Sequence, residues 1–323
     1  MHEPTYRQAL QQTWYLVWHN KLLWILGVCS AFLGQWGLSD LVGQVNLMIT
    51  SDYSGPFSLI NNWRALLTIP INSVAAVFLT LWLVGIVLLI GLTVVFVAVV
   101  SRSALIAITA AWFQSKTRLS LTVAWHIGVK RFWTVLALIV INKILQLAIV
   151  VSLGGVFWLA NLDNLVHIIG LVVFSILALF IALMFEAAAI YACGYAVVEQ
   201  NHFLRAVRRG FYLFSKHILV SLETGLLLFF LNLLLVGAVV VGSFFIFIPS
   251  FLMWLVAGLS GVSILFNIGM ILGLTLFVLL VVILGGFFNA FTTSAWTYLF
   301  MKMHHEGVVA RLAHYAKRLI SRG

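Results

Sequence analysis

The chain has 323 residues, of which 63% are hydrophobic and only 8% are charged. Soluble globular proteins carry about 25% charged residues, so this composition excludes a soluble protein with an ordinary water-facing surface and predicts an integral membrane protein. The 18 lysine and arginine residues outnumber the 8 acidic ones and lie beside the apolar segments, which favours contact with anionic lipid headgroups over contact with nucleic acid.

Six apolar segments approach or exceed the length of about 20 residues that an α-helix needs to cross a bilayer. They are 22–38, 71–100, 132–160, 165–198, 217–248 and 264–301. Pro249 is expected to end the fifth segment. Unpaired backbone groups are costly in lipid, and the alternating pattern of a β-barrel is absent, so we predict an all-α, multi-pass membrane protein with six transmembrane helices in one membrane domain, 1–323.

The positions of the basic residues predict the orientation of these helices. Sixteen of the 18 lysines and arginines fall on the side that carries both chain ends, whereas the connection 39–69 carries only Arg64. Because basic residues are enriched in cytoplasmic loops, both termini are expected in the cytoplasm.

Amphipathic helices are predicted on the cytoplasmic side before the first, third and fifth spans. Three sets of residues share the spacing i, i+4, i+7 and i+11, the first of them more loosely: Tyr6, Leu10, Thr13 and Val17; Leu121, Trp125, Gly128 and Phe132; Phe203, Val207, Gly210 and Phe214. An alanine has the same offset in each set: Ala9, Ala124 and Ala206. This spacing puts the residues on one helix face. It predicts a threefold parallel repeat with units 1–118, 119–198 and 199–301.

A fourth amphipathic helix, with a basic face, is predicted over 307–322. Such a helix lies in the headgroup plane, where it either recognises an anionic lipid or a partner protein or serves as a simple anchor, the interpretation that we favour. The candidate headgroup-binding residues of all these helices are Lys130, Arg131, Arg205, Arg208, Arg209, Arg311, Lys317 and Arg318.

Two charged residues lie deep inside the predicted spans. Lys143 is about 16 Å and Glu186 about 18 Å from the cytoplasmic ends of consecutive antiparallel helices. An isolated charge at mid-membrane costs at least about 2.5 kcal/mol, so we predict a Lys143–Glu186 pair. Asn142, Gln146 and Asn289 reach similar depth and complete a predicted polar cluster. The cluster is either a transport site or a set of interhelical bonds that fixes helix register, and we favour the second interpretation.

A second charge site is expected nearer the cytoplasm. Glu223 lies about 10 Å from the edge of its span. Its candidate partners are Arg102, Lys216 and Arg209, and we favour a structural pair with Arg102.

Motifs for catalysis, metals or cofactors are not evident. The chain lacks HExxH, GxxxxGK[ST] and GxSxG. Adjacent His304 and His305 point to different faces of a helix and make a poor metal pair. Cys29 and Cys193 lie in apolar segments and are expected to be buried thiols. No enzyme activity, metal or cofactor is therefore predicted.

Four stretches resemble uncharacterised bacterial six-helix membrane proteins, which are akin to the membrane domain attached to some glycerophosphodiester phosphodiesterases. The stretches are ALQQTWYLVWHNKLLWILG, SRSALIAITAAWFQSKTRLSLTVAWHIGVKRFWTVLAL, VVEQNHFLRAVRRGFYLFSKHILVSL and FTTSAWTYLF. The resemblance implies the six-helix fold and a bacterial cytoplasmic membrane. Nothing in the chain resembles the catalytic barrel of the phosphodiesterases, so the resemblance implies no activity and no site residues.

Two hypotheses for the function follow. The first is a non-enzymatic membrane module whose cytoplasmic helices bind anionic lipid headgroups, a partner protein or a second copy of the chain. The alternative is a transporter or channel with Lys143 and Glu186 in its pathway.

Overall fold

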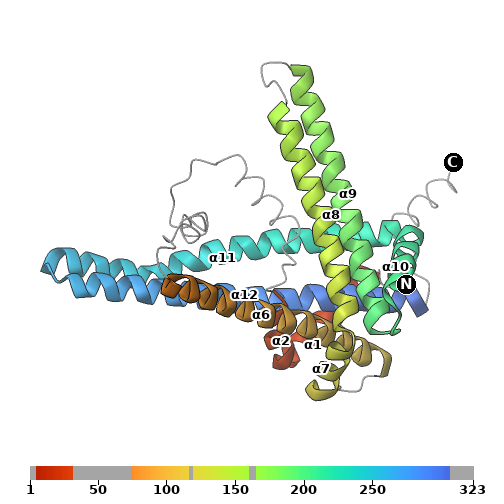
Figure 1. Cartoon of the computed structure of the whole chain (residues 1–323), viewed down its shortest axis with the longest axis horizontal. Helices are drawn as coiled ribbons and strands as arrows, with labels where there is room; N and C mark the ends of the chain where they lie inside the picture. The colour runs from red at the N-terminus through yellow and green to blue at the C-terminus, as the bar shows by residue number, and fades with distance from the viewer. Residues whose placement is uncertain (1–4, 32–73, 116–118, 160–164, 306–323) are drawn as a thin grey trace. The chain divides into compact units, whose positions relative to one another are not determined.

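A computed structural model describes residues 5–31, 74–115, 119–159 and 165–305, and this part of the chain is helical without any strand (Figure 1). The helices are α1 (Thr5–His19), α2 (Lys21–Ala31), α6 (Val74–Ser115), α7 (Leu121–Lys130), α8 (Phe132–Leu159), α9 (Leu165–Val197), α10 (Phe203–Lys216), α11 (Ile218–Ser260) and α12 (Ser263–His305). The predicted all-α class is confirmed for these residues.

Five of the described helices are apolar and long enough to cross a membrane, as a multi-pass membrane protein requires. These candidate spans are Thr80–Gln114, Phe132–Val156, His167–Val197, Ile218–Ser260 and Ile264–His304. The first predicted span, 22–38, corresponds to the shorter apolar helix α2, and its remainder lies outside the described residues, as do the loop 39–69 and the predicted helix 307–322.

Two predicted helix ends are wrong. Pro249 does not end the fifth span, because α11 continues through it to Ser260. A proline inside a helix removes one backbone hydrogen bond, but stopping the helix in an apolar environment leaves several backbone groups without partners. The second span was expected to end at Val100, yet α6 continues past Arg102 to Ser115.

The chain divides into two compact units. Unit 1 contains Met1–Leu33, Ala98–Ile139 and Ala187–Gly323, and unit 2 contains Gly34–Val97 and Val140–Glu186. Helices α6, α8 and α9 therefore contribute residues to both units.

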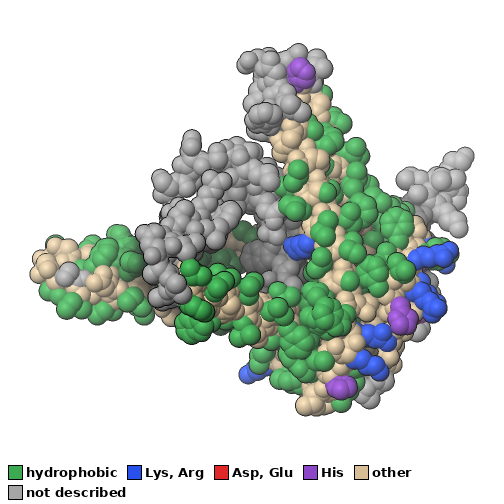
Figure 2. Space-filling model, in the orientation of Figure 1, with side chains coloured by type: hydrophobic (Ala, Val, Ile, Leu, Met, Phe, Trp, Pro, Cys, Tyr) green, Lys and Arg blue, Asp and Glu red, His purple; other side chains and the backbone are tan. Residues whose placement is uncertain are grey.

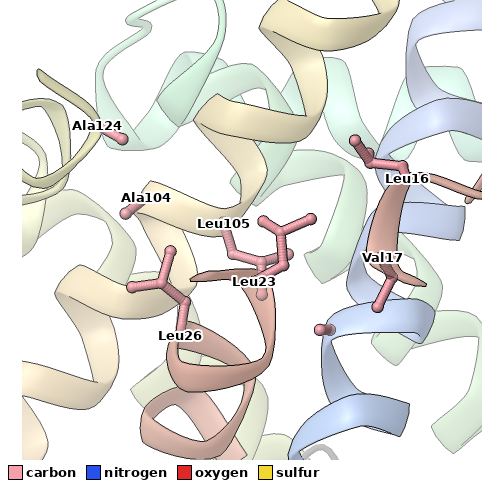
Figure 3. Close-up of a cluster of buried hydrophobic side chains, with 8 residues drawn as sticks. Leu16, Val17, Leu23, Leu26, Ala104, Leu105 and Ala124 are labelled. Atoms are coloured by element: carbon pink, nitrogen blue, oxygen red, sulfur yellow. The ribbon is translucent and has the colours of Figure 1, made fainter. Parts of the chain in front are cut away.

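The core of unit 1 forms around α12, which packs against α1, α2 and α11. A buried apolar cluster joins α1, α2, α6, α7 and α12; it consists of Leu16, Val17, Leu23, Leu26, Ala104, Leu105, Ala124 and Ala290. Figure 3 shows Leu23 and Leu26 of α2 lying against Ala104 and Leu105 of α6. The short helices α1, α2 and α7 therefore share one core with the long apolar helices α6 and α12.

Glycines permit the closest helix approaches in this core. A Cβ on Gly27 of α2 would collide with the carbonyl of Gly286 on α12, and a Cβ on Gly286 would collide with Val28. Small residues at helix crossings bring backbones into direct contact, which is how apolar helices gain packing energy when lipid removes the hydrophobic driving force.

Helices α11 and α12 form a hairpin of two 43-residue helices. Gly261 joins them in a left-handed conformation, with φ of 70°, a backbone geometry that costs glycine little. Along the hairpin, Gly269 and Gly273 of α12 lie against Ser250 of α11. Most of the side chains that face outward are apolar, including Leu259, Val262 and Ile264 at the turn, although Ser260 and Asn267 are exposed there as well.

Candidate functional site: the amphipathic helix α10 and its ionic cluster

Helix α10 turns one face to the core of unit 1. Its buried residues are Ala206, Gly210, Leu213 and Phe214, and their spacing of 4, 7 and 8 residues places them on one side of a helix. Two of these residues, Gly210 and Phe214, belong to the set that the sequence pattern placed on one helix face. Val207 was predicted on the same face but is 40% exposed.

A second, exposed face of α10 is apolar. Leu204 and Phe211 are 78% and 49% exposed, and with Val207 they stand 3, 4 and 7 residues apart, which places all three on one side of the helix. We call these three residues the apolar strip. Helix α10 therefore has one apolar face buried in protein and a second one that no described residue covers.

The third face of α10 is basic. Arg205, Arg208, Arg209 and Lys216 are all exposed. Arg205 lies three, four and eleven residues before the other three, which places all four on one side of the helix. Figure 2 shows lysine and arginine side chains gathered over α10, whereas much of the rest of the visible described surface is hydrophobic. We call these four residues the basic face.

Two glycines let α7 and α10 lie close against the apolar helices that precede them. A Cβ on Gly128 of α7 would lie 2.7 Å from the carbonyl oxygen of Val100 on α6, and a Cβ on Gly210 of α10 would lie 2.7 Å from the backbone nitrogen of Ala192 on α9. Thr13, which has the corresponding place in the pattern of α1, is fully buried, and α1 packs on α12.

An ionic cluster holds α10 to the ends of α9 and α12. The carboxylate of Glu199 accepts a hydrogen bond from Arg209 Nη1 at 2.7 Å and lies 2.8 Å from His304 Nε2. Asn201 Nδ2 donates a third bond to it at 2.9 Å. The hydroxyl of Tyr195 lies 3.4 Å from the other ring nitrogen of His304. Glu199 therefore links residues of α10 and α12 that are far apart in the sequence.

The turn after Glu199 is constrained as well. Gln200 has a φ of 55°, a left-handed conformation that is uncommon outside glycine and asparagine. Its side-chain oxygen accepts a hydrogen bond from Arg131 Nη2 at 3.2 Å. This turn ties the end of α9 to the start of α8 and places Glu199 beside α10.

The structure places the remaining predicted headgroup residues as follows. Lys130 ends α7 and is exposed, whereas Arg131 is half-buried and engaged with Gln200. Arg311, Lys317 and Arg318 lie outside the described residues.

Four residues of the predicted polar cluster lie in unit 2. Lys143 and Glu186 are both half-buried, on α8 and α9. Gln146 is only 7% exposed, and the side-chain oxygen of Asn142 is buried without a hydrogen-bond partner. The Lys143–Glu186 pair remains a prediction.

Asn289, the fifth predicted member, lies in unit 1 and has partners there. Its side-chain nitrogen donates to the carbonyl of Gly27 at 2.8 Å and to Ser30 Oγ at 2.7 Å, so it links α12 to α2. Of the second predicted charge site, Arg102 and Glu223 are both half-buried, and their pairing also remains a prediction. Arg209, once a candidate partner of Glu223, donates to Glu199.

Sequence reasoning missed Glu199 as the centre of the cluster. One signal was available, because Glu199 is an acidic residue in a strongly basic segment of a chain that has only 8 acidic residues in total. An isolated carboxylate among arginines is expected to pair with one of them. Its second partner, His304, could not be inferred from spacing.

Within the described ranges, no group of three histidine, cysteine or acidic side chains is arranged to hold a metal ion. Cys193 is a buried free thiol, and Cys29 is a half-buried one. Comparisons with protein families, curated proteins and solved structures found no match to this chain.

Proposed function

We propose that the protein is a non-enzymatic membrane module that binds anionic lipid headgroups through α10. The observation that carries this proposal is the exposed surface of α10, where the apolar strip adjoins the basic face. On such a helix the apolar side chains enter the acyl boundary and the basic side chains meet headgroup phosphates. Arginine suits this role because its planar guanidinium can donate two parallel hydrogen bonds to a phosphate.

Removing charge from the basic face is expected to weaken binding of anionic lipid. Arg205→Gln and Arg208→Gln should each cost about 1 kcal/mol, which is about fivefold in Kd. The measurement is a titration of the purified full-length chain, in zwitterionic detergent, with fluorescent phosphatidylglycerol and with phosphatidylcholine that has the same acyl chains. High salt should reduce the preference for phosphatidylglycerol.

A matched control separates a site on α10 from a general effect of net charge. Lys21→Gln removes one exposed positive charge from α2 and should change the Kd by less than either arginine variant does. An equal effect of all three substitutions would contradict a site on α10. If no variant alters a preference for phosphatidylglycerol, the face would be assigned to a partner protein.

We further infer the membrane arrangement in which this site works. The proposal is six spans in a bacterial cytoplasmic membrane, with both termini in the cytoplasm and three repeats that each begin with an interfacial helix. The five candidate spans support it, and so does the excess of basic residues on one side of the chain. The similar glycine contacts of α7 and α10 support the repeat.

Transport through the region of Lys143 is the second candidate function. The observation in its favour is the buried, unpartnered side-chain oxygen of Asn142 beside Lys143 and Gln146. A buried polar atom without a protein partner is a place where water or a polar solute can bind.

If water reaches this region, Lys143→Cys should react with a membrane-impermeant thiol reagent from at least one side of the membrane. The variant is made with Cys29 and Cys193 replaced by serine. Ile144→Cys is the control, because Ile144 is exposed and apolar and should face lipid. A folded Lys143→Cys variant that labels no faster than Ile144→Cys would rule out a water-filled pathway in that state.

A further inference from the structure

The contacts of Arg209 differ from those of the other arginines on the basic face. Arg209 forms an ion pair with Glu199 at 2.7 Å, and its side chain is 55% exposed while that of Glu199 is 22% exposed. Among the residues that the structure describes, Arg205 and Arg208 enter no ion pair. One of the three arginines is therefore already neutralised by the protein itself.

The partners of Glu199 determine which member of this pair can leave. His304 holds one carboxylate oxygen, and Asn201 donates to the other. The His304 ring is itself stacked on Phe300 and packed against Tyr195. Glu199 is thus held by two partners besides Arg209, whereas the side chain of Arg209 is 55% exposed.

We propose that Glu199 is an internal counter-ion that occupies Arg209 until an anionic headgroup displaces it. This inference rests on the proposed lipid-binding function and adds a regulatory contact to the same site. Exposed ion pairs contribute little net stability, and a phosphate offers arginine a bidentate acceptor, so Arg209 can exchange one anion for the other. The carboxylate also repels an approaching phosphate. The affinity of the basic face for an anionic headgroup is therefore lower than it would be without Glu199.

Replacing Glu199 by glutamine tests this exchange. The amide keeps an oxygen acceptor for Arg209 but removes the negative charge. Glu199→Gln should bind phosphatidylglycerol about two- to fivefold more tightly than the unchanged protein does, since about one basic contact is released. Binding of phosphatidylcholine should not change. In the double variant Glu199→Gln/Arg209→Gln the gain should disappear.

A second test leaves Glu199 intact in case its replacement prevents folding. In the unchanged background, Arg209→Gln should weaken binding of phosphatidylglycerol less than Arg205→Gln does, because Arg209 must first leave its counter-ion. An equal or larger loss would overturn the proposal. So would a folded Glu199→Gln variant with unchanged or weaker binding, which would make Glu199 a structural anchor of α10.

The outcomes also separate this inference from the proposed function. If Arg205→Gln and Arg208→Gln weaken binding but Glu199→Gln does not strengthen it, only the counter-ion exchange fails. If the unchanged protein does not distinguish phosphatidylglycerol from phosphatidylcholine, the lipid-binding function itself fails.

Discussion

Replacing Gly286 by alanine is expected to destabilise the fold by about 1–3 kcal/mol or more, the cost of overpacking a close contact. The added Cβ would collide with the side chain of Val28 and lie 3.0 Å from its backbone nitrogen. Backbone atoms of α2 cannot move aside as a flexible side chain could, so α2 and α12 must separate. The measurement is the apparent melting temperature of the purified protein in detergent. It is obtained from the fraction of monodisperse protein that remains after heating.

The neighbouring glycine provides a matched control for this experiment. A Cβ on Gly285 would meet nothing within 4 Å, and alanine is a better helix former than glycine by about 0.5–1 kcal/mol. Gly285→Ala should therefore leave the melting temperature unchanged or raise it slightly. If the two variants melt alike, the close approach of α2 and α12 at Gly286 is not a determinant of stability.

Loss of the Asn289 side chain should destabilise the same interface by a different mechanism. Asn289 is buried and donates hydrogen bonds to the Gly27 carbonyl and to Ser30 Oγ. Asn289→Ala removes both bonds and leaves Ser30 and Gly27 with fewer partners, which costs about 1–3 kcal/mol for buried groups. The readout is again the melting temperature in detergent.

Asn267 offers the control on the same helix. It is exposed, so Asn267→Ala should have little effect. The double variant Asn289→Ala/Ser30→Ala should lose less than the sum of the two single losses, because both substitutions remove the same bond. Additive losses, or equal losses for Asn267→Ala and Asn289→Ala, would argue against the hydrogen bond as the source of stability.

The spans were best predicted where polar residues lie on both sides of an apolar run. Helices α8 and α9 agree closely with the segments 132–160 and 165–198, which lie between Arg131 and Glu199. The prediction failed where a single residue was read as a boundary. Arg102 and Pro249 both lie inside continuous helices, because one unfavourable residue costs less than the backbone hydrogen bonds that a break would remove.

The site was predictable only in part for a related reason. Periodicity placed Val207, Gly210 and Phe214 on one face of α10, but it did not show that Gly210 and Phe214 are buried whereas Val207 is 40% exposed. A period gives the angular position of a residue, whereas its burial depends on how much of the apolar arc another helix covers. The ionic cluster could not be predicted from the sequence, because Glu199 and His304 come together only through the packing of α9 and α12.

The length of the α11–α12 hairpin has a consequence for any bilayer that contains it. Each helix has 43 residues, or about 65 Å at 1.5 Å per residue, against a hydrocarbon layer of about 30 Å. Because the outer surface is mostly apolar along its whole length, an upright hairpin would expose roughly half of that surface to water. The hairpin can remain in the hydrocarbon only by inclining about 60° from the membrane normal, beyond the usual range of up to about 40°. Its angle would then change with bilayer thickness, and α11, which contacts α10, would change its orientation together with the hairpin.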